Sequence, residues 1–142
     1  MARSVDSHAQ QVQSAQLAQV PLCGSFALVV DELRDKKVCD LGCNQGHYLQ
    51  FAGPGSLGLD VSEESLSACR ARGLTVQKHD LNQLPLPVSD AAFEVVLLSH
   101  VLEHVTAPLA MLRECNRLLP PEGTLIIGLV SLSPVVLTAI FG

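Results

Sequence analysis

Residues 38–46 read VCDLGCNQG, an apolar stretch that ends in an acid and runs into two glycines four residues apart. A glycine-rich turn directly after a strand is a common ligand-binding feature of parallel α/β sheets. The turn does not match GxGxxG, because Asn44 replaces the middle glycine of that dinucleotide fingerprint. The stretch therefore predicts a ligand-binding turn after the first strand, and it matches the dinucleotide type poorly.

Helix-like and strand-like segments alternate along the chain around this turn. The clearest helix covers 63–72, with Ser62 as N-cap, two glutamates in the first turn and Gly73 as its stop. Residues 93–99, FEVVLLS, form a near-continuous apolar run, as expected of a parallel strand that is buried on both faces. The other expected elements are helices at 23–34, 46–52 and 107–119, strands at 37–41, 56–61, 74–78 and 123–129, and a loop around Pro85 and Pro87.

This alternation predicts an α/β fold, with a doubly wound, mostly parallel sheet of about five strands and flanking helices. The chain has 142 residues, of which 48% are apolar, so it is long enough for one domain with a core. We expect that domain to cover 23–142, after a polar helical segment over 1–22. Ligands of such sheets bind at the carboxyl ends of the strands.

Acids follow three successive strands of the expected sheet, at Asp40, Asp60 and Asp80. Asp40 lies where a pyrophosphate would approach, and two like charges about 4 Å apart repel by about 4 kcal/mol at an effective dielectric of 20. A cationic ligand suits this position better, and Asp60 would accept hydrogen bonds from ribose hydroxyls. Any one of these acids is by itself a common loop-end residue. Together they favour S-adenosylmethionine, which carries an ammonium, a sulfonium and no phosphate.

Four segments resemble the class I S-adenosylmethionine-dependent methyltransferases, and most closely the methyltransferase type 11 group related to ubiquinone- and biotin-pathway enzymes. The resemblance covers about two-thirds of the chain, and it implies a Rossmann-like methyltransferase fold, S-adenosylmethionine as cofactor and a small-molecule methyl acceptor. The four segments are VCDLGCNQG (38–46), GLDVSEESLSACRARG (58–73), HDLNQLPLPVSDAAFEVVLLSHVLEHV (79–105) and LRECNRLLPPEGTLIIG (112–128).

The resemblance also implies residue roles. It places Asp40 near the methionine moiety of the cofactor, Asp60 at the ribose and Asp80 at the adenine. His100 and His104 are the candidate catalytic residues, as general bases that titrate near neutrality or as polar residues at the crevice rim. The rest of the implied cofactor-binding set is Gly42, Cys43, Gly46, Val61, Leu81 and Ser99.

Residues 100–104, HVLEH, match the H-x-x-E-H motif of inverted zinc peptidases. That chemistry needs both histidines on one face of a long helix and a third ligand downstream. Here the motif directly follows a buried strand, and Pro108 comes four residues later. We therefore expect no metal site, and a zinc hydrolase ranks third among the hypotheses.

The type 11 fold continues beyond the fifth strand, whereas this chain ends at Gly142. We expect the apolar fifth strand, 124–130, to be an unpaired edge. Either the chain is then a fragment, or this edge pairs with a partner or, in a homodimer, with a second copy of the chain. The second hypothesis is accordingly a non-catalytic adenosyl-binding or interaction module. Residues 123–142 carry no charge and are long enough to span a bilayer, but Pro134 and the lack of a basic anchor favour a buried strand followed by a loop or helix start.

Charge and cysteine usage narrow the expected partners and compartment. The net charge is −5 and the nine Lys and Arg residues are scattered, which argues against an obligatory nucleic-acid partner. Five cysteines form no CxxC pair, as expected of free thiols in a reducing compartment. The first twenty residues contain no apolar leader segment, so we expect a cytoplasmic protein.

Overall fold

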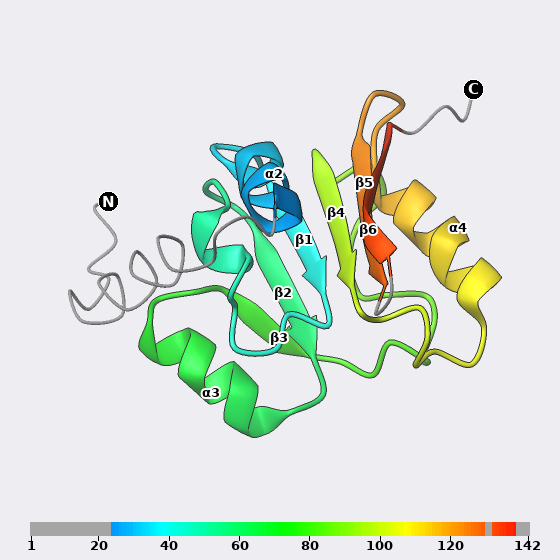
Figure 1. Ribbon diagram of the computed structural model, residues 1–142. Coiled ribbons are helices and arrows are strands. Elements are labelled where there is room, and N and C mark those ends of the chain that lie inside the picture. Colours follow the sequence, from blue (N-terminus) through cyan, green and yellow to red (C-terminus); the bar gives the residue numbers. More distant parts are fainter. Residues whose placement is uncertain (1–23, 130–131, 139–142) are drawn as a thin grey trace.

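A computed structural model describes residues 24–129 and 132–138 of the chain. It contains one six-stranded sheet with the order β3-β2-β1-β4-β5-β6 (Figure 1), in which β1 to β5 are parallel and β6 is antiparallel to β5. The predicted doubly wound, mostly parallel α/β fold is confirmed. The strands are β1 (Val38–Leu41), β2 (Leu57–Asp60), β3 (Val76–Lys78), β4 (Val95–Ser99), β5 (Thr124–Leu129) and β6 (Leu132–Thr138), and the helices are α2 (Gly24–Leu33), the 3-10 helix η1 (Leu49–Phe51), α3 (Glu63–Ala71) and α4 (Pro108–Leu118).

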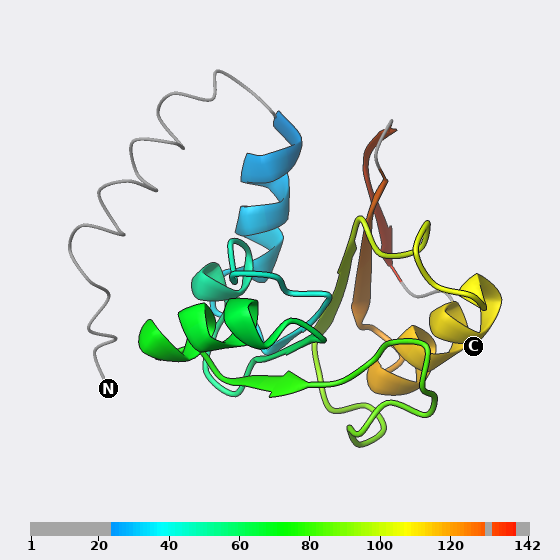
Figure 2. The same cartoon turned by 90° about the horizontal axis from the view of Figure 1, so that it is seen from below.

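Helices cover both faces of the sheet. Figure 2 shows α2 and α3 on one side and α4 on the other. Buried residues of α2 and α3, such as Leu33 and Leu66, pack in one core layer, and Met111 and Leu118 of α4 pack in the other. The strand order reverses between β1 and β4, which is the position where sheets of this type bind ligands.

The central strand β4 shows why the run 93–99 is apolar throughout. Val95 and Leu97 point into the layer under α2 and α3, whereas Val96 and Leu98 point into the layer under α4. All four side chains are buried. A strand with helices on both faces has no solvent-facing positions, so the polar half of the usual alternation is missing.

Helix α3 begins and ends where its sequence predicts. The Ser62 hydroxyl accepts a hydrogen bond from the Ser65 N–H at 3.2 Å, and the first turn carries Glu63 and Glu64. After the helix, Gly73 has a φ of +75°, a conformation that glycine adopts without strain. This cap fixes the start of α3 directly after β2.

The predicted helix over 46–52 is wrong. The chain forms turns up to Tyr48 and then only the single 3-10 turn of η1. The physical reason is the backbone before it, because Asn44 and Gly46 have positive φ values of 48° and 77°, which no α-helix contains. The short connection to Gly53, whose N–H bonds the Lys36 carbonyl at 2.7 Å, leaves no room for a longer helix.

The prediction that the fifth strand is an unpaired edge is also wrong. Strand β6 pairs along β5, with Ile127 opposite Val135 and Thr124 opposite Thr138. The β-branched residues of 132–138 favour a strand where we expected a loop or helix start. Because β6 occupies the outer side of β5, a homodimer through an exposed fifth strand loses its basis.

Two further expectations concern the ends of the chain. The predicted polar helical segment over 1–22 lies outside the described residues. Within 24–129 and 132–138, no helix is both long enough and apolar enough to cross a membrane.

Candidate functional site

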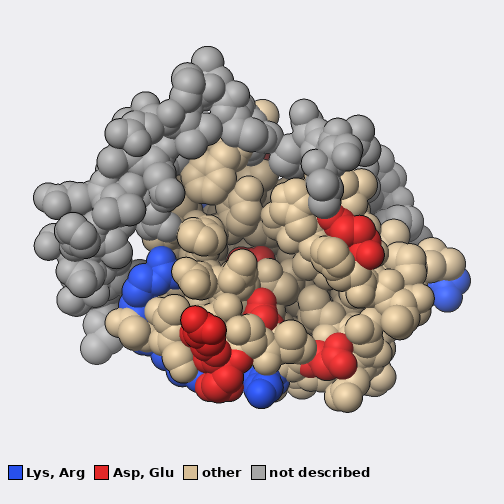
Figure 3. Space-filling view, turned by 60° about the horizontal axis from the view of Figure 1, so that its bottom comes forward, with Lys and Arg blue, Asp and Glu red and all other residues tan. Residues whose placement is uncertain are grey.

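A cavity of about 600 Å³ opens at the carboxyl ends of β1 to β4. Figure 3 shows the hollowed face of the molecule, with acidic side chains gathered on it. Every residue predicted for the site except Gly46 lines this cavity. Those residues are Asp40, Gly42, Cys43, Asp60, Val61, Asp80, Leu81, Ser99, His100 and His104.

Asp40, near the end of β1, is the most deeply buried polar residue of the cavity wall, with 2% of its surface exposed. No described residue donates a hydrogen bond to its carboxyl group or forms an ion pair with it. Burial, and secondly the charge of Asp60, raise the pKa of Asp40 from the ordinary 3.8 to about 7. A buried carboxyl group without a donor or cation is unfavourable by itself, so it is suited to a positively charged ligand.

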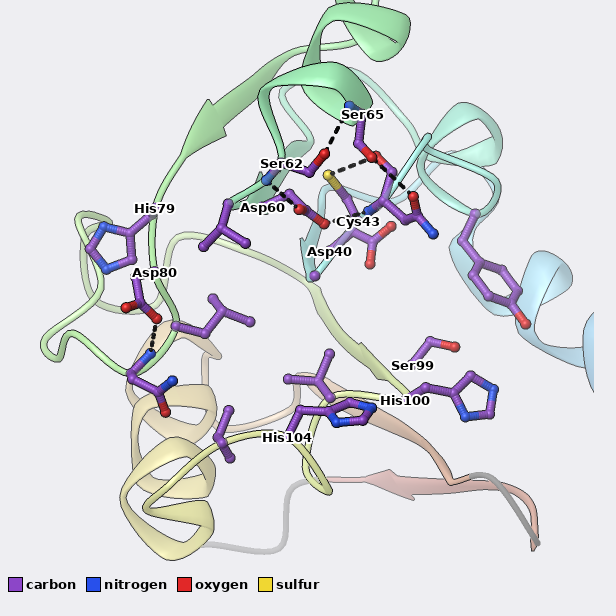
Figure 4. A pocket seen from close by; sticks show the side chains of 18 of the residues that line it. Asp40, Cys43, Asp60, Ser62, Ser65, His79, Asp80, Ser99, His100 and His104 are labelled. Atoms are coloured by element: carbon purple, nitrogen blue, oxygen red, sulfur yellow. Dashed lines mark hydrogen bonds between the residues drawn. The ribbon is translucent and has the colours of Figure 1, made fainter.

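Asp60, the last residue of β2, is held at both of its carboxylate oxygens. Oδ2 accepts the Asn44 N–H at 2.8 Å, and Oδ1 accepts the Ser62 N–H at 2.9 Å. These bonds tie the end of β2 to the turn after β1 (Figure 4). Each oxygen keeps acceptor capacity, so the carboxylate can receive two hydroxyl groups of a ligand, such as those of a ribose.

The turn after β1 depends on glycine at two positions, for different reasons. At Gly42, φ is +75° and a Cβ atom would lie 2.7 Å from Val101 Cγ2, on the wall of the cavity. At Gly46, φ is +77° and a Cβ atom would lie 2.5 Å from Leu74 Cδ1. Gly46 therefore packs against the connection between α3 and β3, which explains why the structure does not bring it to the cavity.

The loop after β3 forms another part of the wall. Asp80 Oδ1 accepts the Asn82 N–H at 2.9 Å, and the His79 ring nitrogen Nε2 lies 2.7 Å from the Gln83 carbonyl oxygen. Leu81 follows Asp80 and is partly buried against the core layer under α4. The loop thus presents a carboxylate beside an apolar side chain.

The two candidate catalytic histidines lie across the cavity from Asp60 and Asp80 (Figure 4). His100 has a φ of +57°, and its N–H donates to the Gly128 carbonyl at 2.8 Å. Its ring atom Nδ1 lies 3.6 Å from Glu103 Oε1. A strained backbone at a cavity wall is a common feature of functional sites.

The HVLEH segment forms turns between β4 and α4. Its histidines therefore lack the shared helical face that a zinc peptidase requires. Within the described ranges, no cluster of three or more His, Cys, Asp or Glu side chains has the arrangement of a metal site.

Cys43, on the cavity wall, is buried and not disulfide-bonded. Burial, and secondly the charge of Asp40, raise the pKa of its thiol. The neutral thiol packs on Gly58, where a Cβ atom would lie 2.7 Å from Cys43 Sγ. Cys43 therefore contributes an apolar surface to the cavity.

Sequence reasoning missed part of the wall. Ser62 and Asn82 lie within two residues of an acid that was predicted, so extending each strand end by two residues would have found them. His47 and Tyr48 were missed because the segment was expected to be a regular helix. The missed lining residues are Asn44, His47, Tyr48, Ser62, Ser65, Asn82, Val101 and Val105.

Comparison with known families gives one match that covers most of this region. Residues 39–127 match the family model described as methyltransferase domain. The match begins in β1 and ends in β5, and it includes every predicted site residue.

Among curated proteins, the chain is similar to a ubiquinone biosynthesis O-methyltransferase of Methylococcus capsulatus. The two are 36% identical over 112 residues, which cover 73% of this chain and 47% of that protein. The chain thus spans about half the length of the curated relatives it matches.

Solved structures give the same picture of the fold. A Thermotoga maritima S-adenosylmethionine-dependent methyltransferase, titled a possible histamine N-methyltransferase, is 27% identical with a TM-score of 0.62, covering 75% of this chain and 50% of that one. A Mesorhizobium loti S-adenosylmethionine-dependent methyltransferase is 29% identical with a TM-score of 0.59, covering 68% and 47%.

Proposed function

Since the chain belongs to the methyltransferase-domain family, we propose that its cavity binds S-adenosylmethionine and that the chain methylates a small-molecule acceptor. The observation that carries the proposal is the buried Asp40 carboxyl, to which no described residue donates. A cavity with such a group at its base is suited to a cation, and S-adenosylmethionine carries an ammonium and a sulfonium.

The rest of the wall supports the same ligand. Asp60 is oriented by two backbone N–H groups and keeps acceptor capacity for the two ribose hydroxyls. Val61, with 55% of its surface exposed, offers an apolar face beside it for the adenine ring. Asp80 and Leu81 follow on the same wall, as an acceptor for the adenine amino group and an apolar contact.

When bound, S-adenosylmethionine would supply an electrophilic methyl group. The protein's own contribution is to hold the acceptor close to that group, in line with the bond that breaks, and to exclude water. Val101 and Leu81 provide apolar wall near the turn after β1, where a Cβ atom on Gly42 would lie 2.7 Å from Val101 Cγ2 and 3.9 Å from Leu81 Cδ1.

We further propose a hydroxyl-bearing acceptor. The relative with 36% identity is named an O-methyltransferase, whereas the structural neighbour titled as a possible N-methyltransferase is 27% identical. A hydroxyl group must lose its proton, and His100, which lines the cavity, is our candidate for the base that accepts it. Glu103 Oε1 lies 3.6 Å from His100 Nδ1, on the same loop.

A second candidate function is adenosyl binding without turnover. The acids of the cavity wall, Asp40, Asp60 and Asp80, support adenosyl binding by themselves. Turnover distinguishes the two candidates, whereas cofactor binding is common to both.

Calorimetric titration with S-adenosylhomocysteine tests the binding site. Asp60→Asn should weaken binding at least about tenfold, because a hydrogen bond to a charged group contributes about 1.5–3 kcal/mol. Asp31→Asn is the matched control, since Asp31 is exposed on α2 and outside the cavity wall. Equal dissociation constants for the two variants would refute the assignment of Asp60.

A further inference from the structure

Two loops face each other across the cavity, and they carry different parts of the proposed reaction. The segment 79–84, after β3, provides Asp80 at the adenine end. The segment 99–107, after β4, provides His100 and His104 on the acceptor side. For methyl transfer, the second loop must be in place when the cofactor is bound.

The two loops are joined through a single side-chain oxygen. Asn82 Oδ1 accepts the Thr106 N–H at 2.9 Å and the Thr106 hydroxyl at 3.2 Å. In the part of the chain that the structure describes, these are the only hydrogen bonds between 79–84 and 99–107. The backbone N–H of Asn82 in turn donates to Asp80 Oδ1 at 2.9 Å.

The position of Thr106 makes this contact important for the second loop. The loop is tied at its start by the hydrogen bond from His100 N–H to the Gly128 carbonyl. At its other end, Ala107 provides no side-chain cap for α4, so Thr106 is the last residue with a side-chain anchor before the helix. The histidines lie between these two fixed points.

We propose that Asn82 is a positioning residue that transmits cofactor docking at Asp80 to the loop with His100 and His104. This inference rests on the proposed function. A ligand held by the Asp80 carboxylate fixes the turn 80–82, and the Asn82 side chain then holds Thr106 and the end of the second loop.

Hydrogen exchange measured with and without S-adenosylhomocysteine tests this coupling on the full chain. For the wild type, we expect the ligand to protect 42–62, 79–84 and 99–107. Asn82→Ala should keep protection of 42–62, while protection of 99–107 is lost. Thr106→Ser keeps both donors and should retain the protection.

Asn116→Ala, an exposed substitution on α4, is the control and should behave as wild type. Protection of 99–107 that persists in Asn82→Ala would overturn the inference and leave the proposed function intact. Failure of the wild type to bind the ligand would overturn both. If thermal melting shows that Asn82→Ala is unfolded, Asn82→Leu takes its place, because leucine has a similar size and no acceptor for the two Thr106 donors. Unchanged protection of 99–107 in that variant would also overturn the inference.

Discussion

Asp40 is the residue on which the proposed ligand most depends. Asp40 lies in the fully buried strand β1, and only 2% of its surface is exposed. Desolvation favours the neutral acid, which is why its pKa rises to about 7. Such a residue destabilises the fold when it is ionised, and the cationic ligand that we propose would offset this cost.

The raised pKa of Asp40 makes stability depend on pH. Between the unfolded value of 3.8 and the folded value of about 7, the folded carboxyl holds a proton that the unfolded one has released. Stability therefore falls as the pH rises through this window. Asp40→Asn should remove the fall and stabilise the chain at about pH 8 by up to about 4 kcal/mol, from about three pKa units. Urea unfolding at several pH values measures this.

The same substitution should act oppositely on binding. Asp40→Asn removes the charge that faces the ligand ammonium, so affinity for S-adenosylhomocysteine should fall while stability rises. In the wild type, affinity should also fall as the pH drops below about 7 and Asp40 becomes protonated. A variant that is more stable and binds equally well would contradict the role of Asp40.

At the scale of elements, the connection between β3 and β4 contains no helix and is held by side chains of α4. Arg117 donates to the carbonyls of Leu86 and Val88 at 3.1 and 2.7 Å, and to the carboxylates of Glu114 and Asp90. Glu114 Oε2 in turn accepts the Leu86 N–H at 2.8 Å. These bonds fix 86–90 over the core layer that α4 covers.

Arg117→Ala should destabilise the chain by about 2–3 kcal/mol, since it removes the cation that pairs with Glu114 and Asp90 and the donor of two loop carbonyls. Arg117→Lys keeps the charge but not the planar guanidinium group, so it should destabilise the chain by about half as much as Arg117→Ala. Arg113→Ala, an exposed substitution on the same helix, serves as the control in urea unfolding. If Arg117→Ala and Arg113→Ala unfold at the same urea concentration, the hydrogen bonds of Arg117 contribute nothing measurable to stability.

Elements with a strong local signal could be predicted, and elements set by tertiary context could not. The apolar run of β4 and the Ser62 cap of α3 are local, so both elements were found within two residues. The segment 46–52 has helix-compatible residues, but the positive φ of Asn44 and Gly46 is set by contacts with β2 and α3. Strand β6 depends on its pairing with β5, which no local pattern specifies.

At the scale of the whole molecule, the sequence predicted which side chains meet because parallel strands end at one edge. Asp40, Asp60 and Asp80 are far apart in the chain, yet they follow neighbouring strands and therefore line one cavity. The contact between Asn82 and Thr106 spans 24 residues and two loops, so no spacing rule predicts it. Gly46 was assigned to the binding site because it lies in the glycine-rich motif. In the structure it lies against Leu74, and the motif does not predict that contact.

The central claim is that this cavity selects an adenosyl ligand that carries an ammonium group over a dinucleotide. Parallel calorimetric titrations of the wild-type chain with S-adenosylhomocysteine and with NADH test it most directly. We expect micromolar binding of S-adenosylhomocysteine and no detectable binding of NADH, because Asp40 repels a pyrophosphate and attracts an ammonium. Binding of NADH with equal or higher affinity would contradict the account.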